Sequence, residues 1–177
     1  MTEPRIVTAS PDDTARIARL AGLTFALACP PGTASSAIEQ FIEENLSEEC
    51  FDRYLRDPAR QLLVADVKGT AVGYTMLVFG DPADEDVATA ISLRPAVELS
   101  KVYVLETHHG GGVAATLMAS TLDAARDRGA SGVWLGVNQQ NQRAIRFYTK
   151  SGFRIVGSKT FFVGPEKQSD HVLERRL

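Results

Sequence analysis

The sequence has few cysteines, no long apolar run and no surplus of basic residues, and each absence excludes a class of protein. Cys29 and Cys50 do not have the spacing of a metal or redox motif, so we expect reduced thiols that pack as small apolar side chains. No apolar stretch reaches the roughly 18 residues that a membrane span needs. Residues 1–5 lack the basic-then-apolar pattern of a secretory signal. We therefore expect a cytoplasmic protein with no membrane partner.

The charge balance argues against a nucleic-acid partner. The chain has 19 Lys and Arg residues against 22 Asp and Glu residues, a formal net charge of −3, whereas nucleic-acid binding needs clustered basic residues. A mildly acidic protein is compatible with a cationic substrate. Its 177 residues, 44% of them apolar, suffice for one globular domain spanning residues 1–177.

The first half of the chain alternates between strand and helix patterns. Residues 5–9 alternate apolar and polar side chains, and the following Ser-Pro-Asp-Asp has the cap, proline and acidic residues of a helix start. That helix ends at Pro30, and residues 35–57 have the apolar stripes of two short helices. Residues 61–67 and 71–79 are predicted to form a hairpin, and residues 80–86 an acidic surface loop.

The second half continues the alternation. Gly110 to Gly112 open a predicted helix that runs to Arg128 and ends at Gly129, and Asn141 caps another that reaches Lys150. The predicted strands are residues 97–105, 133–137, 153–158 and 171–177. The pattern predicts one mixed α/β domain.

Three glycines at the start of a helix indicate an anion site. They let the backbone approach a ligand closely, and the helix N-terminus turns its N–H groups towards a group such as a pyrophosphate. A dinucleotide-binding fold would have a Gly-x-Gly-x-x-Gly motif straight after the first strand, and a nucleotide-triphosphate loop would have Gly-Lys-Ser/Thr. Neither pattern is present. A flexible loop that merely precedes a helix remains the alternative.

Two motifs resemble those of the Gcn5-related N-acetyltransferase (GNAT) superfamily. Residues 109–114, His-Gly-Gly-Gly-Val-Ala, resemble its Gln/Arg-x-x-Gly-x-Gly/Ala loop, with His109 at the position of Gln or Arg. Residues 141–153 resemble its Asn-x-x-Ala-x-x-Phe-Tyr-x-x-x-Gly-Phe signature. Within the superfamily, residues 97–177 look most like the PaiA-type bacterial spermidine/spermine N-acetyltransferases.

This resemblance implies the GNAT fold: a mixed, mostly antiparallel sheet of about seven strands, with helices on both faces and a splay between strands 4 and 5. It also implies acetyl-CoA as co-substrate, with its pantetheine arm in the splay and its pyrophosphate on the glycine loop. The residues it assigns to cofactor binding are Val102, Tyr103, Val104, His109, Gly110, Gly111, Gly112, Val113, Ala114, Asn138, Asn141 and Tyr148. For Asn141, a plain helix cap is the alternative, and one side chain can serve both purposes.

Acetyl transfer requires an amine that loses a proton and a thiolate that gains one. We expect Tyr148 to be the general acid, because a phenol can protonate a thiolate; its alternative is a core aromatic residue. Glu98 stands where the histone-acetylating branch of the superfamily has its general base. A carboxylate in a desolvated cleft suits that role, although Glu98 could instead only attract a cationic amine. No activated nucleophile is visible, which favours direct transfer over an acyl-enzyme.

The sequence leaves the acceptor amine open. A polyamine is favoured by the PaiA-like second half and by the acidic residues within 39–52 and 84–86. The alternatives are a protein N-terminus, an antibiotic or an amino-acid-like amine, or a non-catalytic sensor that only binds acyl-CoA. No metal is expected, because the adjacent His108 and His109 have no partner motif around them. The family is compatible with a homodimer.

Overall fold

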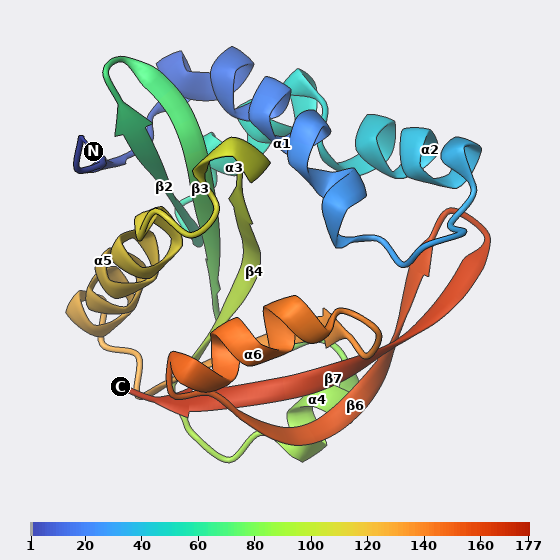
Figure 1. The fold of residues 1–177 in the computed structure, drawn as a ribbon. Coiled ribbons are helices and arrows are strands. Elements are labelled where there is room, and N and C mark those ends of the chain that lie inside the picture. Colours follow the sequence, from blue (N-terminus) through green and yellow to red (C-terminus); the bar gives the residue numbers. More distant parts are fainter. Residues whose placement is uncertain (1) are drawn as a thin grey trace.

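The structure is a computed structural model that describes residues 2–177, and one seven-stranded sheet runs through it (Figure 1). The strands are β1 (Arg5–Thr8), β2 (Arg60–Val67), β3 (Thr70–Phe79), β4 (Ala96–Val104), β5 (Gly132–Asn138), β6 (Arg154–Val163) and β7 (Glu166–Arg176). The α-helices are α1 (Thr14–Ala28), α2 (Ser35–Asn45), α3 (Glu48–Arg56), α4 (Glu85–Ala90), α5 (Val113–Asp127) and α6 (Gln142–Lys150). Within residues 2–177, no helix is both long and apolar enough to cross a membrane.

The strands lie in the order β1-β2-β3-β4-β5-β7-β6. Every neighbouring pair is antiparallel except β4 and β5, which run parallel and pair over only three residues. Beyond those three residues both strands continue without pairing to each other. The predicted mixed sheet of seven strands, with a splay between strands 4 and 5, is confirmed.

Helices cover both faces of this sheet. On one face, α1, α2 and α3 bury a cluster that includes Phe25, Phe51 and Tyr74, and α4 buries a smaller one around Trp134. On the other face, α5 and α6 cover the residues of β3 to β5 and β7. The sheet twists so strongly that β6 and β7 cross the direction of β2 to β4 (Figure 1). As a result, α1 and α2 lie on one side of the splay and α6 lies on the other (Figure 1).

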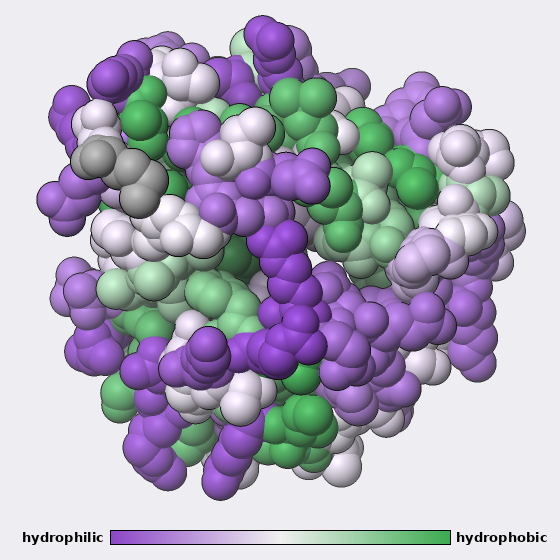
Figure 2. Space-filling view, in the orientation of Figure 1, coloured by the Kyte–Doolittle hydropathy of each residue, from purple (hydrophilic) through white to green (hydrophobic). Residues whose placement is uncertain are grey.

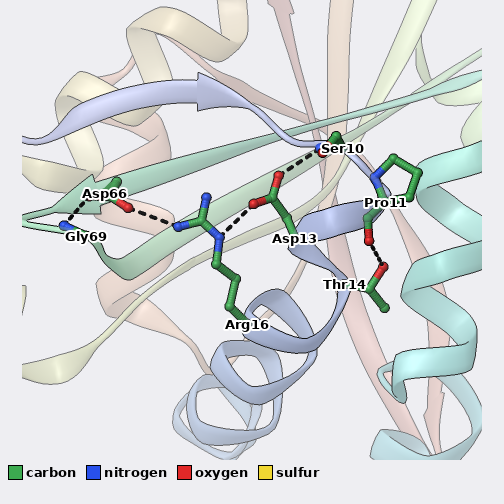
Figure 3. A network of polar contacts seen from close by, with 7 residues as sticks. All are labelled: Ser10, Pro11, Asp13, Thr14, Arg16, Asp66 and Gly69. Carbon is green, nitrogen blue, oxygen red and sulfur yellow. Dashed lines mark hydrogen bonds and ion pairs between the residues drawn. The ribbon is translucent and has the colours of Figure 1, made fainter.

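An ion-pair network anchors the start of α1 to the β2–β3 hairpin (Figure 3). The Asp13 carboxylate accepts a hydrogen bond from the Ser10 N–H at 2.8 Å and pairs with Arg16 at 2.7 Å. Arg16 also donates to Asp66 at 2.9 Å, and Asp66 accepts from the Gly69 N–H in the hairpin turn at 2.7 Å. Asp13, which caps the start of the helix at Ser10, is thus also connected through Arg16 to the β2–β3 hairpin.

Three predictions about the elements were wrong. Residues 85 and 86 are not part of a loop but begin α4, because the Asp84 side chain accepts hydrogen bonds from the backbone of Asp86 and Val87. The last two strands are longer than residues 153–158 and 171–177, since each side of their hairpin extends to the turn at Gly164. Exposed side chains alternate along this extension of β6. A strand with one exposed face has few apolar residues, so its sequence does not clearly indicate a strand.

A buried carboxylate holds the α4–β4 connection on the sheet. Glu174 in β7 is only 2% exposed and accepts hydrogen bonds from the N–H groups of Ser92 and Leu93, at 2.8 and 2.7 Å. These bonds satisfy a carboxylate that would otherwise be costly to bury. They also fix the start of β4, the strand that carries Glu98.

Candidate active site

A cavity opens where β4 and β5 separate. The last of their three paired positions is Glu98 opposite Trp134, after which β4 runs on to Val104 and β5 to Asn138. The cavity measures about 410 Å³ and is lined by residues of β4, β5, α1 and α6. Figure 2 shows the surface hollowed between the upper helices and the α6 region. The site therefore lies at the fork that the topology creates.

Beyond Glu98, the backbone of β4 presents to this fork hydrogen-bonding groups that are not paired with β5. The Leu105 N–H donates to the Val72 carbonyl at 2.8 Å, so the alternation of an antiparallel ladder turns the backbone of Tyr103 towards β3. The same alternation turns the backbones of Val102 and Val104 away from β3, towards the open side. A bulge adds to this, because Met76 pairs with Lys101 and Leu77 with Leu99, which leaves Ser100 without an opposite residue.

The glycine loop is built as its sequence predicts. Gly110 and Gly112 have φ angles of 79° and 81°, and Gly112 is the N-cap of α5. Gly110 and Ala114 line the cavity, whereas Gly111, Gly112 and Val113 do not. The Val113 side chain is buried in the core beneath α5. Only its backbone N–H, at the helix N-terminus, is available to a ligand.

His109 closes the loop onto β4. Its Nε2 atom lies 2.7 Å from the Val104 carbonyl oxygen, which makes Nε2 the donor. Its Nδ1 atom is buried without a hydrogen-bond partner among the described residues. His109 lines the cavity, but its observed bond connects two parts of the protein. The side chain thus fixes the loop that carries the glycines.

Asn138 and Asn141 both line the cavity. The Asn141 side-chain oxygen accepts from the Ala144 N–H at 3.1 Å, so the predicted helix cap is confirmed. Asn138 donates to Gln168 at 2.7 Å and accepts from the Gln140 N–H at 2.9 Å. Both donor and acceptor of the Asn138 side chain are therefore engaged by the protein itself, whereas the Asn141 cap uses only the side-chain oxygen.

Tyr148 reaches the cavity from α6. Its ring lies 5.5 Å from that of Phe147 and 5.9 Å from that of Phe153, so it is also part of an aromatic cluster. Burial raises the pKa of the Tyr148 phenol above its ordinary value. The phenol is consequently neutral, and able to donate a hydrogen, across the physiological pH range.

Glu98 enters the same cavity from β4. Burial raises the pKa of its carboxyl group, while the positive charges of Lys159, Lys101 and Arg60 act in the opposite direction. The two predicted catalytic residues, on different elements and fifty positions apart in the chain, are thus brought into one cavity. A desolvated carboxylate and a neutral phenol can accept and donate protons in one reaction.

The sequence did not single out several other lining residues. Lys101, Lys159 and Asp170 contribute charged groups, and Phe25, Phe41 and Phe161 form an aromatic wall. The Phe25 and Phe41 rings stack at 4.4 Å, and Phe161 meets Phe41 edge-on at 5.6 Å. These residues come from α1, α2, β4, β6 and β7, so only the tertiary arrangement brings them together.

The two adjacent histidines, His108 and His109, each contact a group of the protein. His108 Nδ1 lies 3.0 Å from the Thr107 hydroxyl oxygen, and His109 bonds to Val104. Among residues 2–177, no group of three or more His, Cys, Asp and Glu side chains is arranged to hold a metal ion.

Known proteins share both the sequence pattern and the fold. The model of the acetyltransferase (GNAT) family matches residues 27–153. A protein of Mycobacterium tuberculosis described as an uncharacterized N-acetyltransferase is 47% identical over 165 residues, which are 93% of this chain and 98% of that protein. PaiA N-acetyltransferase of Thermoplasma acidophilum, solved with coenzyme A, has a TM-score of 0.77 at 18% identity, covering 99% of this chain and 100% of its own. YncA of Salmonella typhimurium, solved with acetyl-CoA, has a TM-score of 0.65 at 21% identity, with 99% and 95% covered.

Proposed function

Because this chain belongs to the GNAT acetyltransferase family, we propose that it transfers the acetyl group of acetyl-CoA directly to a primary amine. The observation that carries this proposal is the convergence of Glu98 and Tyr148 on one cavity at the β4–β5 fork. Solved relatives of the same fold contain coenzyme A or acetyl-CoA, which supports the choice of co-substrate. Direct transfer is favoured because burial raises the pKa of Cys29, the cysteine that lines the cavity, to about 11, whereas Cys50 in α3 is not among the residues that line it.

The protein would hold acetyl-CoA mainly through backbone groups. Val102 and Val104 would pair with the pantetheine amides as a neighbouring strand does, although the Val104 carbonyl already accepts from His109. The N–H groups of residues 110–114 would bind the pyrophosphate at the start of α5. The Asn141 amide group would donate to the cofactor arm while its oxygen caps α6. Acetyl-CoA supplies the activated acyl group.

Two side chains would then move protons. Glu98 accepts a proton from the acceptor ammonium, directly or through water, and frees the nitrogen lone pair for attack on the thioester carbon. The new C–N bond forms as the C–S bond breaks. Tyr148 first stabilises the developing charge on sulfur by its hydrogen bond and then donates its proton to it, and the second proton that the nitrogen loses on becoming an amide restores the phenol.

The polyamine version of this function has two supports. Acidic side chains are exposed on α2 and α3, and the PaiA enzyme has the same fold. At 18% identity that likeness extends to the fold alone. We therefore propose a small primary amine as the substrate class and include polyamines in its test. A cytoplasmic location and a homodimer are further parts of the proposal that await experiment.

The decisive experiment compares three variants by steady-state release of the coenzyme A thiol, with acetyl-CoA affinity measured by calorimetry. Tyr148→Phe should lower kcat about 10²- to 10⁴-fold while acetyl-CoA still binds. Glu98→Gln should also lower kcat and remove the decline of activity at low pH, because the base that protonates there is gone. The matched control is Tyr74→Phe, which removes a buried hydroxyl away from the cavity and should leave kcat unchanged.

Other outcomes would change the assignment. If Glu98→Gln raises only KM, Glu98 attracts the amine without acting as base. If acetyl-CoA binds but no amine in a broad panel is acetylated, the protein is a sensor of acyl-CoA and the proposed function is wrong.

A further inference from the structure

The cavity is lined by charged side chains of both signs. Two carboxylates, Glu98 and Asp170, and two lysines, Lys101 and Lys159, line it. A further cation, Arg143, lines the cavity from α6, the helix that also carries Tyr148. The four charges on the sheet sum to zero, and Arg143 adds one positive charge from the side of α6.

These four residues share one face of the sheet. Lys159 and Asp170 are directly opposite each other on β6 and β7, and Asp170 is opposite Asn138 on β5. A side chain at Gly136 would collide with the Lys159 stem, because a Cβ there would lie 2.5 Å from Lys159 Cε and 3.3 Å from Asp170 Oδ2. Lys159 thus crosses over the bare backbone of β5 towards the fork. Its charge is close enough to Glu98 to oppose the rise that burial causes in the pKa of that carboxyl group.

These charges are not used up in contacts with one another. Within residues 2–177, no ion pair shorter than 4.0 Å involves Glu98, Lys101, Lys159 or Asp170. Asp170 is only 5% exposed, yet its Oδ1 atom is buried without a hydrogen-bond partner among the described residues. A buried carboxylate oxygen in that state is costly unless a ligand donates to it.

We infer that the acceptor is a free amino acid with an apolar side chain, its amine facing Glu98 and Asp170 and its carboxylate facing Lys159. This inference rests on the proposed acetyl transfer. A zwitterion matches a neutral site in which opposite charges stand side by side, whereas a polyamine would bring several positive charges next to two lysines. The aromatic wall of Phe25, Phe41 and Phe161 supplies the apolar surface for the side chain.

The test uses pairs of acceptors that differ by one carboxylate. The full-length protein is assayed with acetyl-CoA and L-phenylalanine, phenethylamine, L-leucine, isopentylamine and spermidine, and acetylated products are identified by mass spectrometry. For L-phenylalanine, kcat/KM should exceed that for phenethylamine roughly 10- to 100-fold, as expected for a hydrogen bond to a charged group. The leucine pair should behave alike, and spermidine should fall below both amino acids.

Lys159→Met should abolish the preference for the carboxylate, so that the ratio of kcat/KM for L-phenylalanine to that for phenethylamine falls to about one. Any effect of the lost charge on Glu98 acts on both acceptors and cancels in this ratio. Lys167→Met is the matched control, since Lys167 is exposed on the same hairpin outside the cavity. The inference is overturned if phenethylamine or spermidine is the better acceptor, or if Lys159→Met leaves the ratio unchanged. Acetyl-CoA binding without transfer to any amine would overturn the proposed function as well.

Discussion

Lys101 illustrates how one buried charge connects the site with stability. It lies on β4 in the cavity, with its Nζ atom 5.7 Å from the centre of the Tyr54 ring. Burial lowers the pKa of its amino group to about 8, against the opposing attraction of Glu98. The native protein therefore tolerates the charged form of this lysine less well than the unfolded chain does.

This pKa shift predicts how stability depends on pH. Between about pH 8 and the ordinary lysine pKa, the unfolded chain holds more protons at Lys101 than the native protein, so this residue's contribution makes stability rise with pH. Below pH 8 the charged, buried amine destabilises the native state. Lys101→Met should accordingly raise the free energy of unfolding at pH 7 by about 1–2 kcal/mol, and the gain should vanish above the ordinary lysine pKa.

The measurement is urea unfolding of wild type and Lys101→Met from pH 6.5 to pH 10.5. Lys167→Met, which removes an exposed lysine, should show no such trend. A gain for Lys101→Met that stays constant with pH would mean that better packing, rather than removal of a buried charge, stabilises the variant.

At the scale of the element, the glycine loop depends on its backbone conformation. Gly112 is the N-cap of α5 with φ at 81°, and a Cβ at that position would meet no atom within 4 Å. Any penalty for a side chain there comes from the left-handed backbone alone. Gly112→Ala should thus lower the free energy of unfolding by roughly 1–2 kcal/mol.

Gly111→Ala is the control for this effect, because Gly111 does not have a positive φ angle. Thermal unfolding without ligand compares the two variants. Equal stability would show that the loop relaxes to a right-handed conformation at little cost. A second measurement, acetyl-CoA affinity by calorimetry, tests whether the same change displaces the N–H groups that precede α5.

The elements also show which features a sequence can reveal. Local signals sufficed where one residue determines the geometry: Asn141 caps α6, Gly112 starts α5 and Gly129 ends it with φ at 85°. They failed at α4, where a single Asp84 side chain begins a helix of six residues. Glu98 and Tyr148 were predicted from the offset of Glu98 to the glycine loop and from the family signature that contains Tyr148, and both line the cavity. Lys159 and Asp170 were not predicted as site residues, because only the pairing of β6 with β7 makes them neighbours.

For the whole molecule, the β4–β5 fork is both the binding site and the narrowest connection within the sheet. Three residue pairs join β1–β4 to β5–β7, whereas β5 and β7 pair over seven positions. A ligand that hydrogen-bonds to the unpaired part of β4 would connect the two parts of the sheet where the protein's own ladder stops. Acetyl-CoA is therefore expected to act as a structural bridge as well as a substrate.

Hydrogen exchange can test this bridging role. Acetyl-CoA should slow exchange most at the amides of Val102 and Val104 and of residues 110–114, and should raise the melting temperature as any ligand of the native state does. Amides of β2, which is paired on both sides by β1 and β3, provide the internal control and should change little. If the melting temperature rises while exchange at Val102 and Val104 stays the same, acetyl-CoA binds outside the fork. If acetyl-CoA slows amide exchange only at the fork and in the glycine loop, it binds where β4 and β5 separate and pairs with β4 as a neighbouring strand would.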